Sequence, residues 1–163
     1  MSQQRIRSAV DDLNVSIRQI RATIFELRQR RSSVASLRGA ILDVCEQAAA
    51  SLGFTPSCDI RGPIDTSVEE PWRSHLLLCL REALSNVARH AHATAVLVGV
   101  RVAGDRLELR IADDGVGYRP TAGRPASGID NMRVRAGALG GTFSIETRPT
   151  GGTLIVWDVS LQL

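Results

Sequence analysis

The fold of this 163-residue chain is decided by residues 107–117, which read LELRIADDGVG. Apolar residues alternate with polar ones in this stretch, and that period is typical of a strand with one buried face. The same alternation places Asp113 on the buried face, where a carboxylate is costly unless a donor group pairs with it. Gly115 and Gly117 let the backbone lie close to a flat ligand. The stretch therefore favours a base-binding strand end, with an adenine amino group as donor, over a plain Asp-Gly hairpin turn.

Elements with clear periods surround this stretch. Valines at every second position precede it, and Gly104-Asp105 separates the two strands as a turn. Two more strands follow, and one of three longer helices ends at Gly53. This order predicts an α+β fold, a two-layer α/β sandwich whose mixed, mostly antiparallel sheet carries helices on one face. The expected helices span 34–52, 69–91 and 128–139, and the expected strands span 54–60, 96–102, 107–111, 142–147 and 153–161.

The front of the chain has a heptad pattern. Its apolar residues recur at alternating spacings of four and three without Gly or Pro, which favours a coiled coil or helical bundle over packing on its own domain. The basic run at residues 28–33 breaks the pattern and is predicted to be a linker. We expect a long N-terminal helix over residues 1–31 and a second domain over residues 32–163. The heptad residues are Ile6, Val10, Leu13, Ile17, Ile20, Ile24 and Leu27.

One face of the predicted helix 69–91 carries Glu82, Asn86, Arg89 and His90. Residues three and four apart share a helix face, so these side chains are expected to lie together. A carboxylate and a carboxamide supply the hard oxygen ligands that Mg²⁺ takes, and the basic groups suit phosphates. A solvated polar face is the alternative interpretation. The core stripe of the same helix is predicted to be Leu80, Ala83, Leu84, Val87 and Ala91.

A glycine opens the last predicted helix, in the sequence Ser127-Gly128-Ile129. Free backbone N–H groups at a helix start bind anions, and Arg133 and Arg135 lie one turn further on. A glycine before a helix is common. This feature therefore indicates an anion site only together with the stretch 107–117 and the polar face of the helix 69–91.

Composition excludes several kinds of chemistry. All 20 basic residues are arginine, which rules out a lysine nucleophile and a Walker-type lysine. The cysteines at 45, 58 and 79 lack metal-ligand spacing and are predicted to be buried or incidental thiols. No stretch is apolar enough to span a membrane, so a cytoplasmic location without membrane insertion is expected. The net charge of +3 is dispersed, and aromatic residues do not interleave with a basic patch, which disfavours nucleic acid.

In order and spacing, these features resemble the GHKL ATPase superfamily, which has the Bergerat fold, and within it the sensor histidine kinases. Residues 82–90 resemble the N box, residues 113–117 the G1 box, and residues 128–132 the G2 region beside the lid. Gly140-Gly141 and Gly151-Gly152-Thr153 resemble the terminal glycine box. The resemblance covers the chain from about residue 34 to its end.

The front helix resembles the second helix of the dimerisation and phosphotransfer bundle of these kinases. Residues 17–27, with the pattern Met132-x-x-Arg135-Ala136, point to the branch of nitrate-response, lipid-desaturase and DevS/DosT-type dormancy kinases. The chain departs from the usual pattern in three ways. Arg89 stands where the N box often has lysine, Ala126 replaces the first lid glycine, and the lid over residues 118–127 is short.

The resemblance implies a role for each site residue. Asn86 would coordinate Mg²⁺, and Glu82 would orient Asn86 or the waters bound to the ion. Action of Glu82 as a general base is a second hypothesis. Arg89 and His90 would contact the phosphates of ATP. Asp113 would accept a hydrogen bond from adenine N6. The other nucleotide-binding residues would be Gly115, Gly117, Gly128 and Thr153, the last of which would hold a water beside the carboxylate.

The implied function is that of the catalytic ATP- and Mg²⁺-binding domain of a two-component sensor histidine kinase. It would deliver the γ-phosphoryl group to a histidine on a bundle helix absent from this chain. His75, His90 and His92 are its only histidines, and none has the setting of an acceptor. We expect the C-terminal part of a longer, homodimeric kinase with a response regulator as partner. The alternatives are an anti-sigma-factor-type serine kinase and a degenerate nucleotide-binding or dimerisation scaffold.

Overall fold

The computed structural model describes residues 36–119 and 127–162. The chain divides into two compact units, Met1–Ser36 and Leu37–Leu163, and the fold below is that of the second. The predicted heptad helix and most of the predicted lid lie outside the described residues, so both stay predictions.

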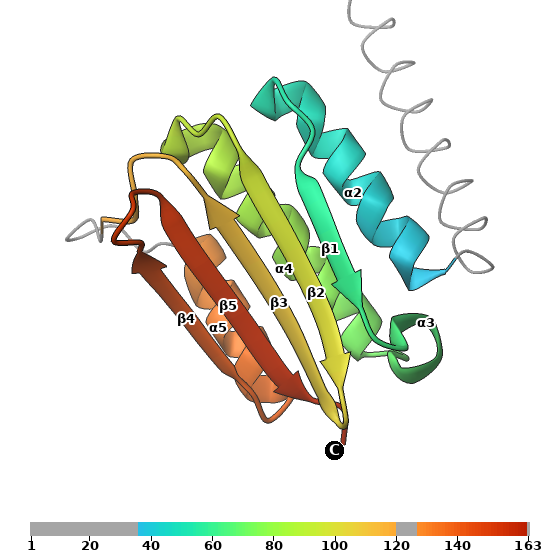
Figure 1. Ribbon diagram of the computed structural model, residues 1–163. Coiled ribbons are helices and arrows are strands. Elements are labelled where there is room, and N and C mark those ends of the chain that lie inside the picture. The colour runs from blue at the N-terminus through green and yellow to red at the C-terminus, as the bar shows by residue number, and fades with distance from the viewer. Residues whose placement is uncertain (1–35, 120–126, 163) are drawn as a thin grey trace, which may run out of the picture. The chain divides into compact units, whose positions relative to one another are not determined.

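A five-stranded sheet forms one layer of this unit, in the order β1-β2-β3-β5-β4 (Figure 1). β1 runs parallel to β2, and the other three pairs are antiparallel. The predicted mixed, mostly antiparallel sheet is therefore confirmed. The strands are β1 (Ser57–Arg61), β2 (Val96–Ala103), β3 (Arg106–Asp113), β4 (Thr142–Thr147) and β5 (Thr153–Ser160).

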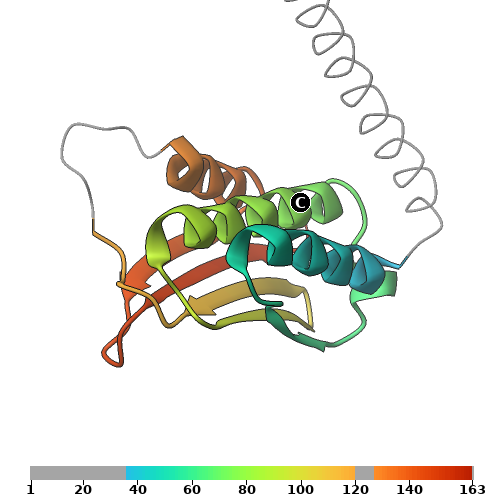
Figure 2. The same ribbon diagram turned by 90° about the horizontal axis from the view of Figure 1, so that it is seen from above.

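The second layer consists of helices, and Figure 2 shows α2, α4 and α5 on the same side of the sheet. This arrangement confirms the predicted two-layer sandwich. The helices are α2 (Leu37–Leu52), α3 (Ile64–Ser67), α4 (Trp72–Asn86), the π-helix η1 (Val87–Ala91) and α5 (Ser127–Ala138).

The core lies between the layers and follows the strand alternation. Val98, Leu109 and Trp157 are fully buried on the inner face of β2, β3 and β5. The predicted stripe of α4 and η1, from Leu80 to Ala91, is buried against them as expected. Burying such apolar surface stabilises the fold by about 25 cal/mol per Å².

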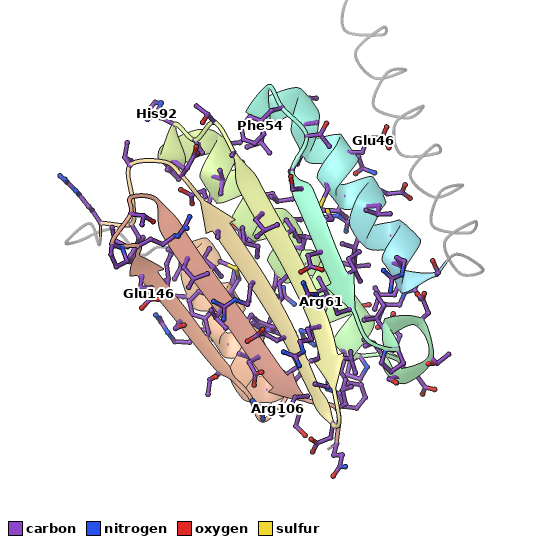
Figure 3. All side chains as sticks on the ribbon, viewed as in Figure 1. Glu46, Phe54, Arg61, His92, Arg106 and Glu146 are labelled. Carbon is purple, nitrogen blue, oxygen red and sulfur yellow. The ribbon has the colours of Figure 1, made fainter. Side chains whose placement is uncertain are left out.

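The opposite face of the sheet is largely polar, although Leu97 is half exposed on it. Arg61 and Arg106, labelled in Figure 3, are exposed there and pair with Asp59 and Asp158. Exposed pairs of this kind contribute only about 0–1 kcal/mol each, so this face adds solubility more than stability. The polar side chains of this outer face also explain why the sequences of β2 and β3 alternate so regularly.

The structure corrects the starts of two predicted elements and the type of one helical turn. The helix predicted from residue 69 begins at Trp72, with Pro71 as its N-cap, because proline has no N–H to donate within a helix. Its last turn, Val87–Ala91, is a π-helix. The strand predicted from residue 54 begins at Ser57, after Gly53 ends α2 with a φ of 82°. The short α3 was not predicted, because four residues show no helical period.

Candidate nucleotide site

A cleft of about 520 Å³ opens where α4 and η1 meet the ends of β3 and β5 and the start of α5. Polar groups of the helices form one wall of this cleft, and apolar side chains of the sheet form another. Its predicted lining residues are Glu82, Asn86, Arg89, His90, Asp113, Gly117, Gly128 and Thr153. Residues not predicted are Ala83, Val87, Ala91, Val116, Tyr118, Arg119, Ile129, Ile145 and Ile155.

Asp113 is a buried residue of the cleft whose carboxylate is held in place by backbone hydrogen bonds. It ends β3 on the inner face and is only 3% exposed, which confirms the burial inferred from the alternation. Its Oδ1 accepts hydrogen bonds from the backbone N–H groups of Gly115 at 2.9 Å and Thr153 at 3.1 Å. Among the described residues no hydrogen bond is recorded at Oδ2. A carboxylate held through one oxygen keeps the other available to a donor in the cleft.

Glycines allow three backbone segments to meet around Asp113. A Cβ on Gly115 would overlap the carbonyl oxygen of Ala91, which accepts from Val116 N at 2.8 Å. A Cβ on Gly152 would overlap the carbonyl oxygen of Asp113 itself. Gly115 therefore shapes the cleft from behind rather than lining it, by letting η1 and the strand end approach closely.

The π-helix places the basic residues of the cleft. Arg89 and His90 are exposed on η1, between the buried residues Val87 and Ala91. The four polar residues predicted to share a face do line one cleft, but the α-helical reason for it holds only up to Asn86. A π-helix turns the following residues relative to an α-helix, and such turns are frequent at functional sites.

Glu82 lies against the first turn of α5. A Cβ on Gly128 would overlap its Oε1, so the glycine leaves the space that the carboxylate occupies. A carboxylate near a helix N-terminus is stabilised by the unpaired N–H groups there. Glu82 thus lies between Asn86, one turn along α4, and the start of α5.

Two of the predicted basic residues are not brought to the cleft. Arg133 pairs with Asp130 at 2.9 Å and stands over the ring of Phe143 at 5.6 Å. Arg135 contacts Nδ1 of His75 at 3.4 Å. Although these arginines follow the helix start by one turn, neither lines the cleft, because their turn of α5 faces β4 and α4.

Several residues of the site were missed from the sequence. The guanidinium of Arg148 donates to the carbonyl oxygen of Asp113 at 3.0 Å, from the β4–β5 connection. Ile145 and Ile155 pair across β4 and β5 and form the apolar wall. No signal in the sequence marks them as site residues, because it is the pairing of Ile155 with Ile111 of the deciding stretch that brings them to the cleft.

The neighbouring Asp114 stabilises the loop that leaves η1. Its carboxylate accepts from Thr94 N at 2.8 Å, Thr94 Oγ1 at 2.6 Å and Ala95 N at 2.9 Å. These bonds, that of the Thr94 side chain foremost, lower the pKa of Asp114 to about 2. The loop begins at His92, which has a φ of 51°, so Asp114 fixes an otherwise strained turn beside the cleft.

We expect Asp114→Asn to lower the thermal midpoint at neutral pH by an amount that disappears in acid. A lowered pKa in the folded state stabilises the protein above the ordinary value of 3.8, and this stabilisation is lost as the pH falls to about 2. Melting curves of both proteins at matched pH values measure the difference. A difference that stays constant through this range would show that the charge of Asp114 is not what stabilises the loop.

The fold and the cleft together define a nucleotide-binding ATPase domain, and comparison with known protein families identifies its family. A model of the histidine kinase-, DNA gyrase B- and HSP90-like ATPases matches residues 73–163. The chain belongs to this family. Within the family it is an ATPase domain of the sensor histidine kinase type.

Two curated relatives illustrate this. The chain is 32% identical over 156 residues to the nitrate/nitrite sensor protein NarX of Escherichia coli (strain K12), covering 95% of this chain and 26% of NarX. It is 35% identical over 138 residues to the histidine-protein kinase/phosphatase UhpB of Salmonella typhimurium, covering 83% of this chain and 27% of UhpB. The chain thus spans about a quarter of the length of these relatives.

Solved structures support the fold. The histidine kinase domain of the blue-light-activated kinase EL346 from Erythrobacter litoralis is similar with a TM-score of 0.63 and 20% identity, over 77% of this chain and 61% of that one. The ATP-binding domain of PrrB from Mycobacterium tuberculosis is similar with a TM-score of 0.57 and 21% identity, over 77% and 94%. In the described ranges, no helix is long and apolar enough to cross a membrane.

Proposed function

We propose that this chain binds ATP with Mg²⁺ in the cleft and delivers the γ-phosphoryl group to a histidine on a bundle helix absent from the chain. The observation that carries the proposal is Asp113, a buried carboxylate held through Oδ1 at the base of the cleft. A buried carboxylate whose second oxygen has no donor among the described residues suits a ligand with an amino group. The family is one of ATPases, and adenine has such a group.

The base of the nucleotide would lie between Asp113 and the apolar wall. Adenine N6 would donate to Oδ2, and Ile145 and Ile155 would pack on the ring. Gly117 would bring the backbone against the ring, since it lines the cleft with a φ of 84°. The hydroxyl of Thr153, whose N–H already bonds to Asp113, would hold a water beside the base.

The phosphates would extend toward α4 and the start of α5. Arg89 and His90 would contact them, and the N–H groups after Gly128 would add to the positive potential. Asn86 and Glu82 line the same wall one helical turn apart. This fits Mg²⁺, which keeps most of its waters and takes one or two protein oxygens beside the phosphates. Asn86 would hold the ion, which neutralises phosphate charge, and Glu82 would orient its waters.

Catalysis by such a site consists of positioning and charge neutralisation. A neutral imidazole attacks phosphorus without first losing a proton, so the site needs no strong base, and the general-base reading of Glu82 is secondary. The acceptor would reach the cleft from the bundle, of which residues 1–31 form one helix in this proposal. We further propose a homodimeric, cytoplasmic kinase domain whose phosphoryl group passes to a response regulator.

Phosphotransfer to a supplied acceptor tests the proposal. The chain is incubated with γ-labelled ATP, Mg²⁺ and the bundle fragment of the full-length protein that carries the acceptor histidine. We expect acid-labile label on the fragment and none on the chain alone. Asn86→Ala should lower the initial rate about a hundredfold or more, whereas Ser144→Ala, an exposed change on β4, should leave it unchanged.

Two results would contradict the proposal. ATP binding without any transfer would favour the degenerate scaffold. Acid-stable label on a serine would favour the serine kinase of the anti-sigma-factor type.

A further inference from the structure

Two of the three cysteines lie side by side although they are far apart in the sequence. Cys45 belongs to α2 and Cys58 to β1, and these two elements lie next to each other in Figures 1 and 2. The thiol of Cys58 donates to Sγ of Cys45 at 3.2 Å. Both are free thiols, and the third cysteine, Cys79, is buried in α4. Cys45 and Cys79 are buried, as predicted, but the sequence did not indicate that Cys45 and Cys58 are in contact.

The two thiols differ in their access to solvent. Cys45 faces the core and is 2% exposed, whereas Cys58 is half-buried on a strand at the edge of the sheet. Among the described strands, β1 pairs with β2 alone, so its other edge carries no strand. A small reagent therefore reaches Cys58 before it reaches Cys45.

The reactivity of the two thiols follows the same order as their access to solvent, with Cys58 ahead of Cys45. Burial, followed by the hydrogen bond from Cys58, raises the pKa of the Cys45 thiol. Because the thiolate is the reactive form, Cys45 stays a poor nucleophile toward reagents in solution. Its sulfur nevertheless lies in place to attack a neighbouring oxidised sulfur, which is the geometry of a resolving cysteine.

We propose that Cys45 and Cys58 form a reversible dithiol–disulfide site that hydrogen peroxide oxidises. The Cys58 thiolate attacks one peroxide oxygen, the O–O bond breaks, and Cys58 becomes a sulfenic acid while water leaves with the Cys58 proton. Cys45 then attacks the Cys58 sulfur, the S–O bond breaks, and a second water leaves with the Cys45 proton. The two thiols lose two electrons in total, and these reduce the peroxide to water.

The cross-link would join α2 to β1 beside the helical wall of the nucleotide cleft. Val44 and Gln47, on either side of Cys45 in α2, line a groove of about 360 Å³ with Leu84 and Arg89. Arg89 also lines the nucleotide cleft. The disulfide would therefore hold α2 in place on β1, and α2 shares this groove with Arg89 of the nucleotide cleft.

Oxidation of the full chain tests the site directly. The reduced protein is treated with hydrogen peroxide, the remaining thiols are alkylated, and the digested protein is analysed by mass spectrometry. We expect two of the three thiols to disappear together, one peptide pair linked through Cys45 and Cys58, and full recovery after dithiothreitol. Cys79→Ala should form the same linked pair.

The variants also separate this site from random oxidation. Cys58→Ser should retain both of its thiols under the same treatment, because Cys45 and Cys79 are buried. Accumulation of sulfinic acid on Cys58 beside an unmodified Cys45 would overturn the proposal. A disulfide formed only between the Cys58 residues of two chains would overturn it as well.

Discussion

Asp113→Asn is expected to lower the affinity for ATP about a hundredfold, which corresponds to about 3 kcal/mol. The amide has the shape of the carboxylate, so its oxygen still accepts from Gly115 N and Thr153 N. Its NH₂ group then occupies the place of Oδ2 and points a donor at the adenine amino group. Two donors that face each other in a buried site lose the bond and repel, whereas the fold keeps its hydrogen bonds.

Calorimetric titration of ATP, with and without Mg²⁺, measures this effect. Asp105→Asn is the matched control, because Asp105 is exposed in the β2–β3 turn and its side chain has no recorded bond among the described residues. The control should bind as the native protein does. An Asp113→Asn protein that melts normally and binds ATP with unchanged affinity would show that the base lies elsewhere.

Gly152→Ala is expected to destabilise the domain by at least about 2 kcal/mol more than Gly151→Ala. Both glycines have positive φ, 83° and 92°, so the backbone strain of an alanine is shared by the two variants. Only at Gly152 would the new Cβ overlap the backbone of Asp113, whereas nothing lies within 4 Å of a Cβ on Gly151. The difference between the variants therefore isolates the close approach of the two backbone segments.

Denaturant unfolding of both variants gives this difference in the free energy of unfolding, provided that each unfolds in a single transition. ATP titration of whichever variants stay folded adds a second readout. Because Gly152 packs on the strand end that carries Asp113, its variant should also bind ATP more weakly than the Gly151 variant. Equal stabilities of the two variants would mean that the β4–β5 turn shifts freely and does not position Asp113.

Much of the fold was predictable because one face of its sheet is exposed to solvent. Burial alternates in β2, β3 and β5 because one face of the sheet is exposed. In β2 and β3 the sequence alternates as well, and that alternation predicted these two strands and the inward direction of Asp113. Glycines that end helices or turn strands, such as Gly53 and Gly104, marked boundaries for the same local reason, since both have positive φ.

The polar part of the candidate site was predictable for a related reason. Glu82 and Asn86 lie one turn apart on one α-helix, so their spacing alone placed them on one wall. The apolar part was harder to predict, because Ile145 and Ile155 look like ordinary core residues in sequence. Only the pairing of Ile145 with Ile155, and of Ile155 with Ile111, brings them to the wall of the cleft.

The sequence by itself determined the local features of this protein: the periods of helices and strands, the buried side of each, and the order of the nucleotide-binding motifs. Only the tertiary structure decided which distant groups meet. It turned Arg133 and Arg135 away from the cleft, brought Arg148 to the backbone of Asp113, and set Cys58 against Cys45. The physical reason is that periodicity reports the environment of a side chain within its own element. Contacts between elements depend instead on strand order and on how the helices pack, which no single stretch of sequence encodes.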